Sequence, residues 1–510
     1  MSAMQTGAAR EWTPKRKSHV SVLAALVVFV VVASALATTE VPSASGAASQ
    51  RPNVVLIMTD DMRKDALARM QVTKRRLAHR GVRFAHAVNS NPLCCPARAG
   101  LLTGQYSHNN GIWSNKSDSM GGGFEDFRAS GANRRTLPKW LWKSGYHTAF
   151  VGKYLNGYSV HGDGVPEPGW SEWRAISGRV GNYLDTIISH NGTKRRTQKY
   201  ITAKLNDIAV NVIGRRAPKP KPFFLWLAHI APHGGVPHEA DDPADIPTPH
   251  VAPRDRNTSS IDVPNHPGFN EADVSDKPEH IRVLEPIDDD RRAQIRENRQ
   301  QHIESLQAVD RGVRRIIEAL RRAGELRNTI IVFASDNGYS MGEHRRKQGK
   351  TLPYDEIIAA PLLMRGPGLP AGHVVTQPVA AMQDVMATVL HWANIWGRYC
   401  CQDSPVAIDG RTLVPLIADP DKAQDRAVLL EGVGGGVGTS PDGIRHHYQG
   451  VRTNWGTYVE YTTGERELYS SSDRWQLDSL HDTPANASDR QSMSADLDRL
   501  RDCSRRSCRR

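Results

Sequence analysis

Three short apolar runs limit what this chain can fold into. They occupy residues 53–58, 223–227 and 329–333, and they are rich in β-branched and aromatic side chains. Runs of this length without polar alternation are typical of parallel strands that are buried on both faces. Between the second and third runs, apolar residues recur at helical spacing, which predicts an amphipathic helix over residues 300–323. Strands that alternate with helices predict an α/β fold with helices on both faces of a mostly parallel sheet.

The 510 residues are enough for one large domain and a smaller one. Residues 233–298 are polar and rich in Pro, Asp and Asn, and they indicate a long surface excursion. After Pro415 the pattern changes to short strand candidates separated by Gly and polar turns, which predicts a small antiparallel sheet. These candidates are residues 428–430, 450–453, 458–461 and 467–469. We therefore divide the chain into a large domain at 51–415, a sheet subdomain at 416–498 and a basic tail at 499–510.

The N-terminus has the pattern of an export signal. Lys15, Arg16 and Lys17 precede an apolar run over residues 20–37 that ends in small residues. We predict a signal peptide at 1–37, a linker at 38–50 and a secreted or otherwise extracytoplasmic protein. An uncleaved anchor is the alternative, and the membrane is a partner only in that case.

The charge is concentrated at the two ends. Lys and Arg number 66 against 54 Asp and Glu, and seven of the twelve net positive charges lie in residues 1–20 and 501–510. The body of the chain is closer to neutral, so we expect no nucleic-acid partner. We expect the Arg-rich tail to be a disordered end, and a contact for a sulfated polymer is the alternative.

The six cysteines are too few for a disulfide scaffold and lack zinc-finger spacing. Cys503 and Cys508 enclose four residues in a chain with an export signal, which makes them candidates for a small disulfide loop. The pairing of Cys95, Cys400 and Cys401 stays open.

Acidic residues follow two of the expected strands. Asp60 and Asp61 come after the first run, and Asp336 and Asn337 come after the third. Each pair alone is more typical of a helix cap or a turn. Together they place three carboxylates and an amide at the carboxyl edge of one sheet, where ligands bind in open α/β folds. Such oxygen donors suit Ca²⁺ or Mg²⁺.

One motif identifies a family. Cys94-x-Pro96-x-Arg98, followed by residues 102–104 (Leu-Thr-Gly), resembles the signature of the type I sulfatases, with Ala97 where that family usually has Ser. The resemblance implies an alkaline-phosphatase-like sulfatase fold with a large, mostly parallel sheet and a smaller C-terminal antiparallel sheet. It also implies that a formylglycine-generating enzyme oxidises Cys94 to formylglycine.

The same resemblance covers roughly residues 50–470 and assigns further site residues. It implies that Asp60, Asp61, Asp336, Asn337 and the modified Cys94 bind a metal, with Ca²⁺ favoured over Mg²⁺. It implies that Lys153 and Lys350 bind the sulfate, that Arg98 stabilises the hydrated aldehyde, and that His233 lies on the substrate side. Lys347 is the alternative to Lys350.

A narrower likeness is to N-acetylglucosamine-6-sulfatase and the heparan-type glucosamine sulfatases. It is carried by residues 152–156, by residues 169–173 and by the two C-terminal cysteines. Many sulfatases have a His where this chain has Leu155, and we expect the adjacent Asn156 to supply a hydrogen bond instead. Asn156 is not a proton-transfer base at neutral pH, which moves acid–base work toward His233 and the lysines.

These observations predict a sulfuric ester hydrolase for a sulfated carbohydrate such as a glycosaminoglycan. In the implied reaction a formylglycine hydroxyl attacks sulfur, and His233 or Lys350 protonates the leaving sugar oxygen. One alternative is a phosphodiesterase or phosphonate monoester hydrolase of the same superfamily. Another is a catalytically silent, carbohydrate-binding protein on the same scaffold.

Overall fold

The computed structural model describes residues 51–117, 121–158, 164–399, 407–419, 426–433 and 447–509. The expected signal peptide at 1–37, the linker at 38–50 and Cys400 and Cys401 lie outside the described residues. Residues 50–510 form one unit, so the boundary that we expect at residue 415 stays a prediction.

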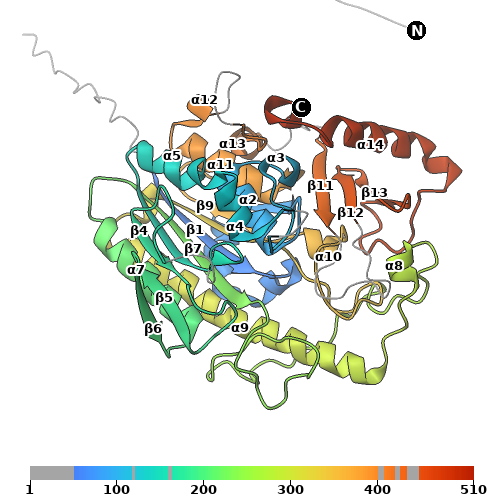
Figure 1. The fold of residues 1–510 in the computed structure, drawn as a ribbon, viewed down its shortest axis with the longest axis horizontal. Helices are drawn as coiled ribbons and strands as arrows, with labels where there is room; N and C mark the ends of the chain where they lie inside the picture. Colours follow the sequence, from blue (N-terminus) through green and yellow to red (C-terminus); the bar gives the residue numbers. More distant parts are fainter. Residues whose placement is uncertain are drawn as a thin grey trace, which may run out of the picture. The chain divides into compact units, whose positions relative to one another are not determined.

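An eight-stranded sheet organises the larger part of this unit (Figure 1). β1 (Asn53–Asp60) lies between β7 (Phe223–Pro232) and β8 (Thr329–Ser335) and is parallel to both. The three expected strands are thus neighbours in the order β10-β2-β9-β8-β1-β7-β3-β4. The remaining strands of this sheet are β2 (Val82–Val88), β3 (His147–Gly152), β4 (Glu172–Ala175), β9 (Leu362–Arg365) and β10 (His373–Ala380). The expected α/β fold is confirmed.

Both faces of the sheet are covered, which explains the apolar runs. Alternate residues of β1 belong to two different core clusters, Leu56 to one and Ile57 to the other. The first cluster includes α2 (Cys94–Thr103), α5 (Leu137–Lys143) and α11 (Ala381–Trp392). The second includes α7 (Ile201–Arg216) and α9 (Asp289–Arg322), and Figure 1 shows the two sets on opposite sides of the strands.

Helix α9 begins earlier than residue 300, where we expected it. The Asp288 side chain accepts a hydrogen bond from the Arg291 backbone and caps the helix, with Asp289 and Asp290 in the first turn. Acidic residues at this end are favourable for the helix dipole. The polar composition that we assigned to the excursion therefore includes the solvated first turns of a helix. The rest of the excursion contains the short α8 (Glu279–Arg282).

The second sheet is the predicted C-terminal antiparallel one. Its order is β11 (Val428–Val433), β12 (His447–Arg452), β13 (Gly456–Tyr461) and β14 (Arg466–Ser470). Helix α14 (Ala487–Leu500) packs on it through Met493, Leu497 and Leu500. No helix in the ranges described above is long and apolar enough to cross a membrane.

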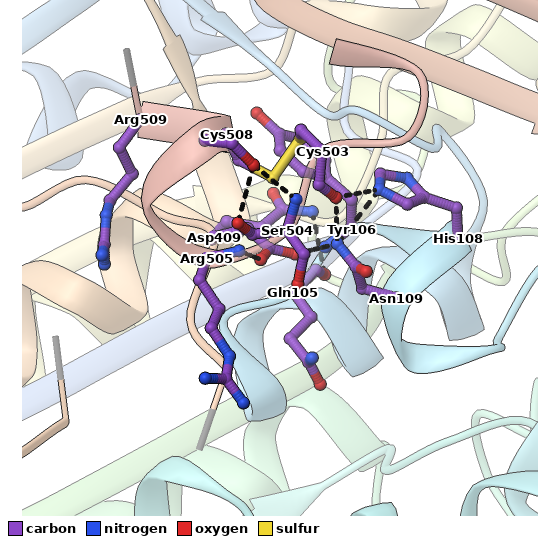
Figure 2. Close-up of a disulfide and its surroundings, with 12 residues drawn as sticks. Gln105, Tyr106, His108, Asn109, Asp409, Cys503, Ser504, Arg505, Cys508 and Arg509 are labelled. Carbon is purple, nitrogen blue, oxygen red and sulfur yellow. Dashed lines mark hydrogen bonds between the residues drawn. A yellow bond between two sulfur atoms is a disulfide. The ribbon is translucent and has the colours of Figure 1, made fainter. Parts of the chain in front are cut away.

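The basic tail is folded, so the expected disordered end is wrong for residues 501–509. Cys503 and Cys508 form a disulfide, as we predicted, around the short helix η6 (Arg505–Arg509) (Figure 2). The Arg505 backbone donates a hydrogen bond to Asp409 (2.8 Å), and the Arg509 guanidinium lies 5.6 Å from the Trp396 ring centroid. The Arg-rich composition suggested disorder, but it does not show that a disulfide loop and contacts with distant residues hold the tail in place.

The remaining elements are short. They are the two-stranded ribbon β5 (Thr186–His190) and β6 (Thr193–Thr197), and the helices η1 (Lys64–Arg69), α1 (Gln71–Arg76), η2 (Ala78–Arg80), α3 (Ser107–Asn110), α4 (Gly123–Ala129), η3 (Ala132–Arg134), η4 (Leu326–Asn328), α10 (Asp355–Ile358), α12 (Trp396–Tyr399), α13 (Val414–Ala418) and η5 (Pro484–Asn486).

Candidate active site

The carboxyl edge of the central strands gathers the residues that the sequence singled out. Asp60 is the last residue of β1, and Asp336 follows β8 directly. Cys94 is the first residue of α2. Lys153, His233 and Lys350 follow β3, β7 and β8, respectively. Parallel strands end at one edge, and this brings segments from distant parts of the sequence into one site.

Arg98 joins the two acidic segments. Its Nε donates to Asp336 (2.8 Å), and its Nη2 donates to Asp60 (3.2 Å). All three side chains are fully buried. Nη1 donates to the backbone carbonyls of Lys153 and Tyr154. Arg98 lies one helical turn after Cys94 on α2, so one helix presents both side chains to this edge.

Cys94 is completely buried among charged groups. Its Sγ lies 3.3 Å from Asp60 Oδ1, and Lys350 Nζ lies 2.9 Å from the same sulfur. Burial, reinforced by the charge of Asp60, raises the pKa of the Cys94 thiol to about 12. The unmodified side chain is therefore a protonated thiol at neutral pH, and only the thiolate is a good nucleophile.

Asp61 is held in an unusual backbone conformation, with φ at 68°. Its carboxylate accepts hydrogen bonds from Asn337 Nδ2 (2.7 Å) and Lys350 Nζ (2.5 Å), and His233 Nε2 lies 3.8 Å away. A non-glycine residue at positive φ costs free energy and is common at functional sites. The turn directs Asp61 toward the same space as Asp60 and Asp336.

Buried carboxylates and buried cations form ion pairs in the site. Lys153 forms an ion pair with Asp60, and Lys350 forms one with Asp61. Burial by itself raises the pKa of Asp60, but Lys153 and the other nearby cations outweigh it and lower that pKa. At Asp336 burial and the charge of Asp60 prevail, and the pKa is raised.

The same groups fit a hard divalent cation. Asp60, Asp61 and Asp336 each offer a carboxylate oxygen, and these oxygens lie within 4.8 Å of one another. Asn337 Oδ1 is buried and has no hydrogen-bond partner, so it is free to act as a ligand. Carboxylate and amide oxygens are the donors that Ca²⁺ and Mg²⁺ prefer.

The structure distinguishes among the predicted basic and polar residues. Lys350 is buried against Cys94, whereas Lys347 is exposed, so the geometry favours Lys350 as the second lysine. Asn156 Oδ1 is buried without a hydrogen-bond partner, and the Asn156 backbone carbonyl accepts from Phe124. Among the residues described, no hydrogen bond joins the Asn156 side chain to Cys94, and its role stays a prediction.

Two supporting residues escaped the sequence reasoning. Asn115 Oδ1 accepts a hydrogen bond from the Cys95 backbone (2.9 Å) and so fixes the start of α2. The Tyr183 hydroxyl donates to the His233 carbonyl (2.7 Å) and fixes the turn that carries His233. Neither residue belongs to a sequence motif for this site, because each acts through a contact with a segment distant in the sequence.

Comparison with known proteins identifies the family. The sequence model of the Sulfatase family matches residues 52–395. The chain belongs to the sulfatase family. That match includes every predicted site residue, from Asp60 to Lys350, and the motif at Cys94.

Curated relatives agree with this assignment. This sulfatase is 30% identical over 462 residues to an arylsulfatase of Volvox carteri, which covers 83% of this chain and 70% of the relative. It is 30% identical over 403 residues to human N-acetylglucosamine-6-sulfatase, covering 76% and 69%. It is 31% identical over 391 residues to the Drosophila melanogaster extracellular sulfatase SULF-1 homolog, covering 74% of this chain but only 32% of that longer protein.

Solved structures show the same fold. One is a protein in complex with its substrate D-glucosamine-2-N,6-O-disulfate, with a TM-score of 0.66, 22% identity, and coverage of 88% of this sulfatase and 97% of that chain. Another is a phosphonate monoester hydrolase from Silicibacter pomeroyi, with a TM-score of 0.60, 22% identity, and coverage of 89% and 96%. The alkaline-phosphatase-like sulfatase fold is confirmed.

Proposed function

We propose that this sulfatase removes sulfate from a sulfated carbohydrate and uses a formylglycine made from Cys94. The observation that carries the proposal is the position of Cys94. It opens α2 at the point where the metal-type oxygen cluster, Lys350 and Asp60 meet. The sequence around it matches the family's modification signal at Cys94, Pro96 and Arg98.

Two groups complete this site when they are present. One is Ca²⁺ or Mg²⁺, a Lewis acid, which would be held by Asp60, Asp61, Asp336, Asn337 and the modified residue 94. The other is the hydrated formylglycine, which supplies a nucleophilic hydroxyl. The side chains of the chain itself position and neutralise the substrate. Lys153 and Lys350 place two positive charges beside Asp60 and Asp61, where they bind the sulfate oxygens. Arg98 keeps Asp60 and Asp336 in place.

His233 is the best placed group to protonate the leaving sugar oxygen. Its side chain is 32% exposed, whereas those of Lys153 and Lys350 are 1% and 8% exposed. A proton donor for a leaving sugar has to lie where the sugar leaves, and it has to regain its proton from solvent. Its Nε2 faces Asp61, which holds the ring toward the site.

The substrate that we propose is a sulfated amino sugar of the N-acetylglucosamine-6-sulfate type. The human relative named N-acetylglucosamine-6-sulfatase supports it, as does the similar solved structure with a disulfated glucosamine. Asn156 would then contribute a hydrogen bond near residue 94. We also propose that the protein acts outside the cytoplasm, which the sequence of residues 1–37 and the relatives named extracellular sulfatases support.

The decisive experiment combines mass spectrometry with one substitution. The peptide that contains Cys94 should have exchanged one sulfur and two hydrogens for one oxygen, and Cys94→Ala should abolish hydrolysis of an aryl sulfate. Cys95→Ala is the matched control, because Cys95 is equally buried but lies outside the charged cluster, and it should keep activity if it folds. An unmodified Cys94 in an active enzyme, or full activity of Cys94→Ala, would refute the proposal.

A second candidate is hydrolysis of a phosphorus ester. The similarity to the phosphonate monoester hydrolase structure favours it, because the two chains share the fold along most of their length. Sulfate and phosphonate esters of one chromogenic alcohol, assayed in parallel, separate the two. We expect a higher kcat/KM for the sulfate ester, and the reverse order would favour the second candidate.

A further inference from the structure

A cavity of about 850 Å³ lies outside the catalytic cluster. It is formed between the β2 and β10 side of the central sheet, helix η1 and the C-terminal sheet with the loop that follows β14. The side chains that line it do not include Asp60, Cys94, Lys153 or Lys350. Its volume is within the range of about 300–1,000 Å³ that is usual for small-molecule sites.

The lining carries more positive than negative charge. Six Lys and Arg side chains line the cavity against four carboxylates. Two of the cations are neutralised within the protein: Arg63 pairs with Asp65 and Glu343, and Arg452 pairs with Asp355. The four that are left are Lys64, Lys74, Arg83 and Arg474, and none of them forms an ion pair within the described ranges.

The two remaining carboxylates of the lining offset at most two of these four cations. Asp473 accepts hydrogen bonds from the backbones of Trp475 and Asp478. Burial raises the pKa of Glu356 to about 7, which leaves this side chain partly protonated at neutral pH. Even when both carboxylates are counted as ionised, the four unpaired cations leave the lining with an excess of two positive charges.

Three of the unpaired cations, Lys64, Arg83 and Arg474, lie close enough to interact. The Lys64 ammonium donates to the Ala85 carbonyl (2.5 Å), in the middle of β2 and two residues after Arg83. Burial lowers the pKa of Lys64, and the charges of Arg452, Arg83 and Arg474 lower it further against the opposing effect of Asp355. Clustered cations in a partly enclosed space repel one another unless an anion lies between them.

The wall of the cavity combines apolar and rigid groups. Leu67, Leu363 and Val374 line it, and Val374 is one of the few large hydrophobic side chains that are exposed. Trp475 is stacked on His266 with ring centroids 3.7 Å apart, and Arg474 lies over the Trp475 ring. A ligand that fits this wall needs apolar surface as well as negative charge. A sugar ring that bears sulfate groups has both, whereas a small inorganic ion has no apolar surface.

We propose that this cavity is a second saccharide-binding site, which holds a sulfated oligosaccharide through Lys64, Arg83 and Arg474. The preference for an anion follows from the cavity itself. The choice of a sulfated sugar rests on the proposed function. The site binds and does not hydrolyse, because the nucleophile and the metal-type oxygens lie elsewhere.

Calorimetric titration tests the proposal with three probes: a heparin-derived tetrasaccharide, its desulfated counterpart and sodium sulfate. For the parent protein we expect two tetrasaccharide sites. In the Lys64→Ala/Arg83→Ala double variant the second site should weaken by about tenfold for each cation that is removed. Lys194→Ala/Arg195→Ala, on the exposed strand β6, is the matched control and should keep both sites.

Arg474→Glu reverses a charge at an exposed position, and it serves as the second test if the double variant does not fold. Aryl sulfate turnover of each variant reports on the catalytic site separately. An absence of turnover in a parent protein whose residue 94 carries the modification refutes the proposed function and leaves the cavity proposal unaffected. Unchanged tetrasaccharide binding in both variants overturns the cavity proposal. Equal binding of the desulfated probe, or equally tight binding of sodium sulfate, overturns the assignment of a sulfated sugar.

Discussion

Arg98 shows how much one residue contributes to this site. Its guanidinium contacts carboxylates at the ends of two different strands and two carbonyls that follow a third, and it is fully shielded from solvent. A planar guanidinium offers five donors in fixed directions, which an ammonium does not. Arg98 thus fixes the relative positions of β1, β8 and the segment after β3 at the point where the metal would bind.

Replacing Arg98 should destabilise the whole protein. Arg98→Ala leaves Asp60 and Asp336 buried without their shared cation, and we expect a decrease of about 3–5 kcal/mol in the free energy of unfolding. Arg98→Lys keeps the charge and should recover part of this decrease. Urea unfolding measures both, and an unchanged midpoint for Arg98→Ala would contradict the structural role assigned to this residue.

A divalent cation should stabilise the protein through the carboxylates. A ligand that binds only the folded state adds about 2.7 kcal/mol at one hundred times its dissociation constant. We expect Ca²⁺ to raise the melting temperature over that in EDTA, and Asp336→Asn to remove most of this increase. Asp262→Asn, at a carboxylate that is 74% exposed, should leave it intact. The same increase in both variants would show that Ca²⁺ binds elsewhere.

Among the elements, the short helix α3 contacts both the C-terminal sheet and the C-terminal disulfide loop. The Ser107 backbone and the His108 ring both contact Glu431 of β11. The other His108 nitrogen lies 2.7 Å from the Cys503 carbonyl (Figure 2). Burial by itself lowers the pKa of His108, but the hydrogen bond and charge of Glu431 outweigh it and raise that pKa to about 9. Asp409, which faces the same cluster through Asn109, acts in the same direction.

This pKa sets a pH dependence of stability. A histidine whose pKa is higher in the folded state stabilises that state fully below its ordinary value of 6.5, and the contribution disappears as the pH rises through about 9. We expect a decrease of about 1–2 kcal/mol over that interval, reduced by partial exposure of the ring. Urea unfolding between pH 6 and 9.5 measures it. Glu431→Gln should flatten the profile, and an equally steep profile in that variant would exclude this pair as the cause.

The elements also show what can be predicted from one sequence. The strands β1, β7 and β8 were recognisable because burial on both faces imposes a run of apolar residues. The candidate site residues could be named because the motif at Cys94 indicated the family, and the family's other motifs assigned the remaining residues. The start of α9, the folded tail and the contacts of Asn115 and Tyr183 were not recognisable, because they depend on a helix cap and on contacts between segments distant in the sequence.

In the molecule as a whole, the C-terminal sheet is a structural part of the active site. Arg452 pairs with Asp355, and Glu467 accepts hydrogen bonds from Tyr354, Tyr461 and Tyr469. Tyr354 follows Lys350 by four residues. The sheet thus holds the segment that brings the second lysine to Cys94.

Removing this sheet should therefore prevent folding of the larger part. A chain that ends at residue 415 lacks the partners of Tyr354, Asp355 and Ser107, and it exposes the apolar residues that β11 covers. We expect an insoluble product or one without a cooperative thermal transition, assessed by circular dichroism. Glu467→Gln in the full chain is the mild control and should fold. A soluble, active 1–415 fragment would show that the two sheets are independent.

The complete burial of Cys94 also has a consequence for how the active protein is made. The modifying enzyme of the proposed function would have to reach this side chain, which in the folded chain is buried against Asp60 and Lys350 at the start of α2. If Cys94 is modified as we propose, the modification has to precede the folding that buries this side chain. A chain that folds first keeps its thiol. Such a molecule would be correctly folded and fully stable, yet inactive, so the yield of folded protein and the yield of active enzyme are set by different events during synthesis.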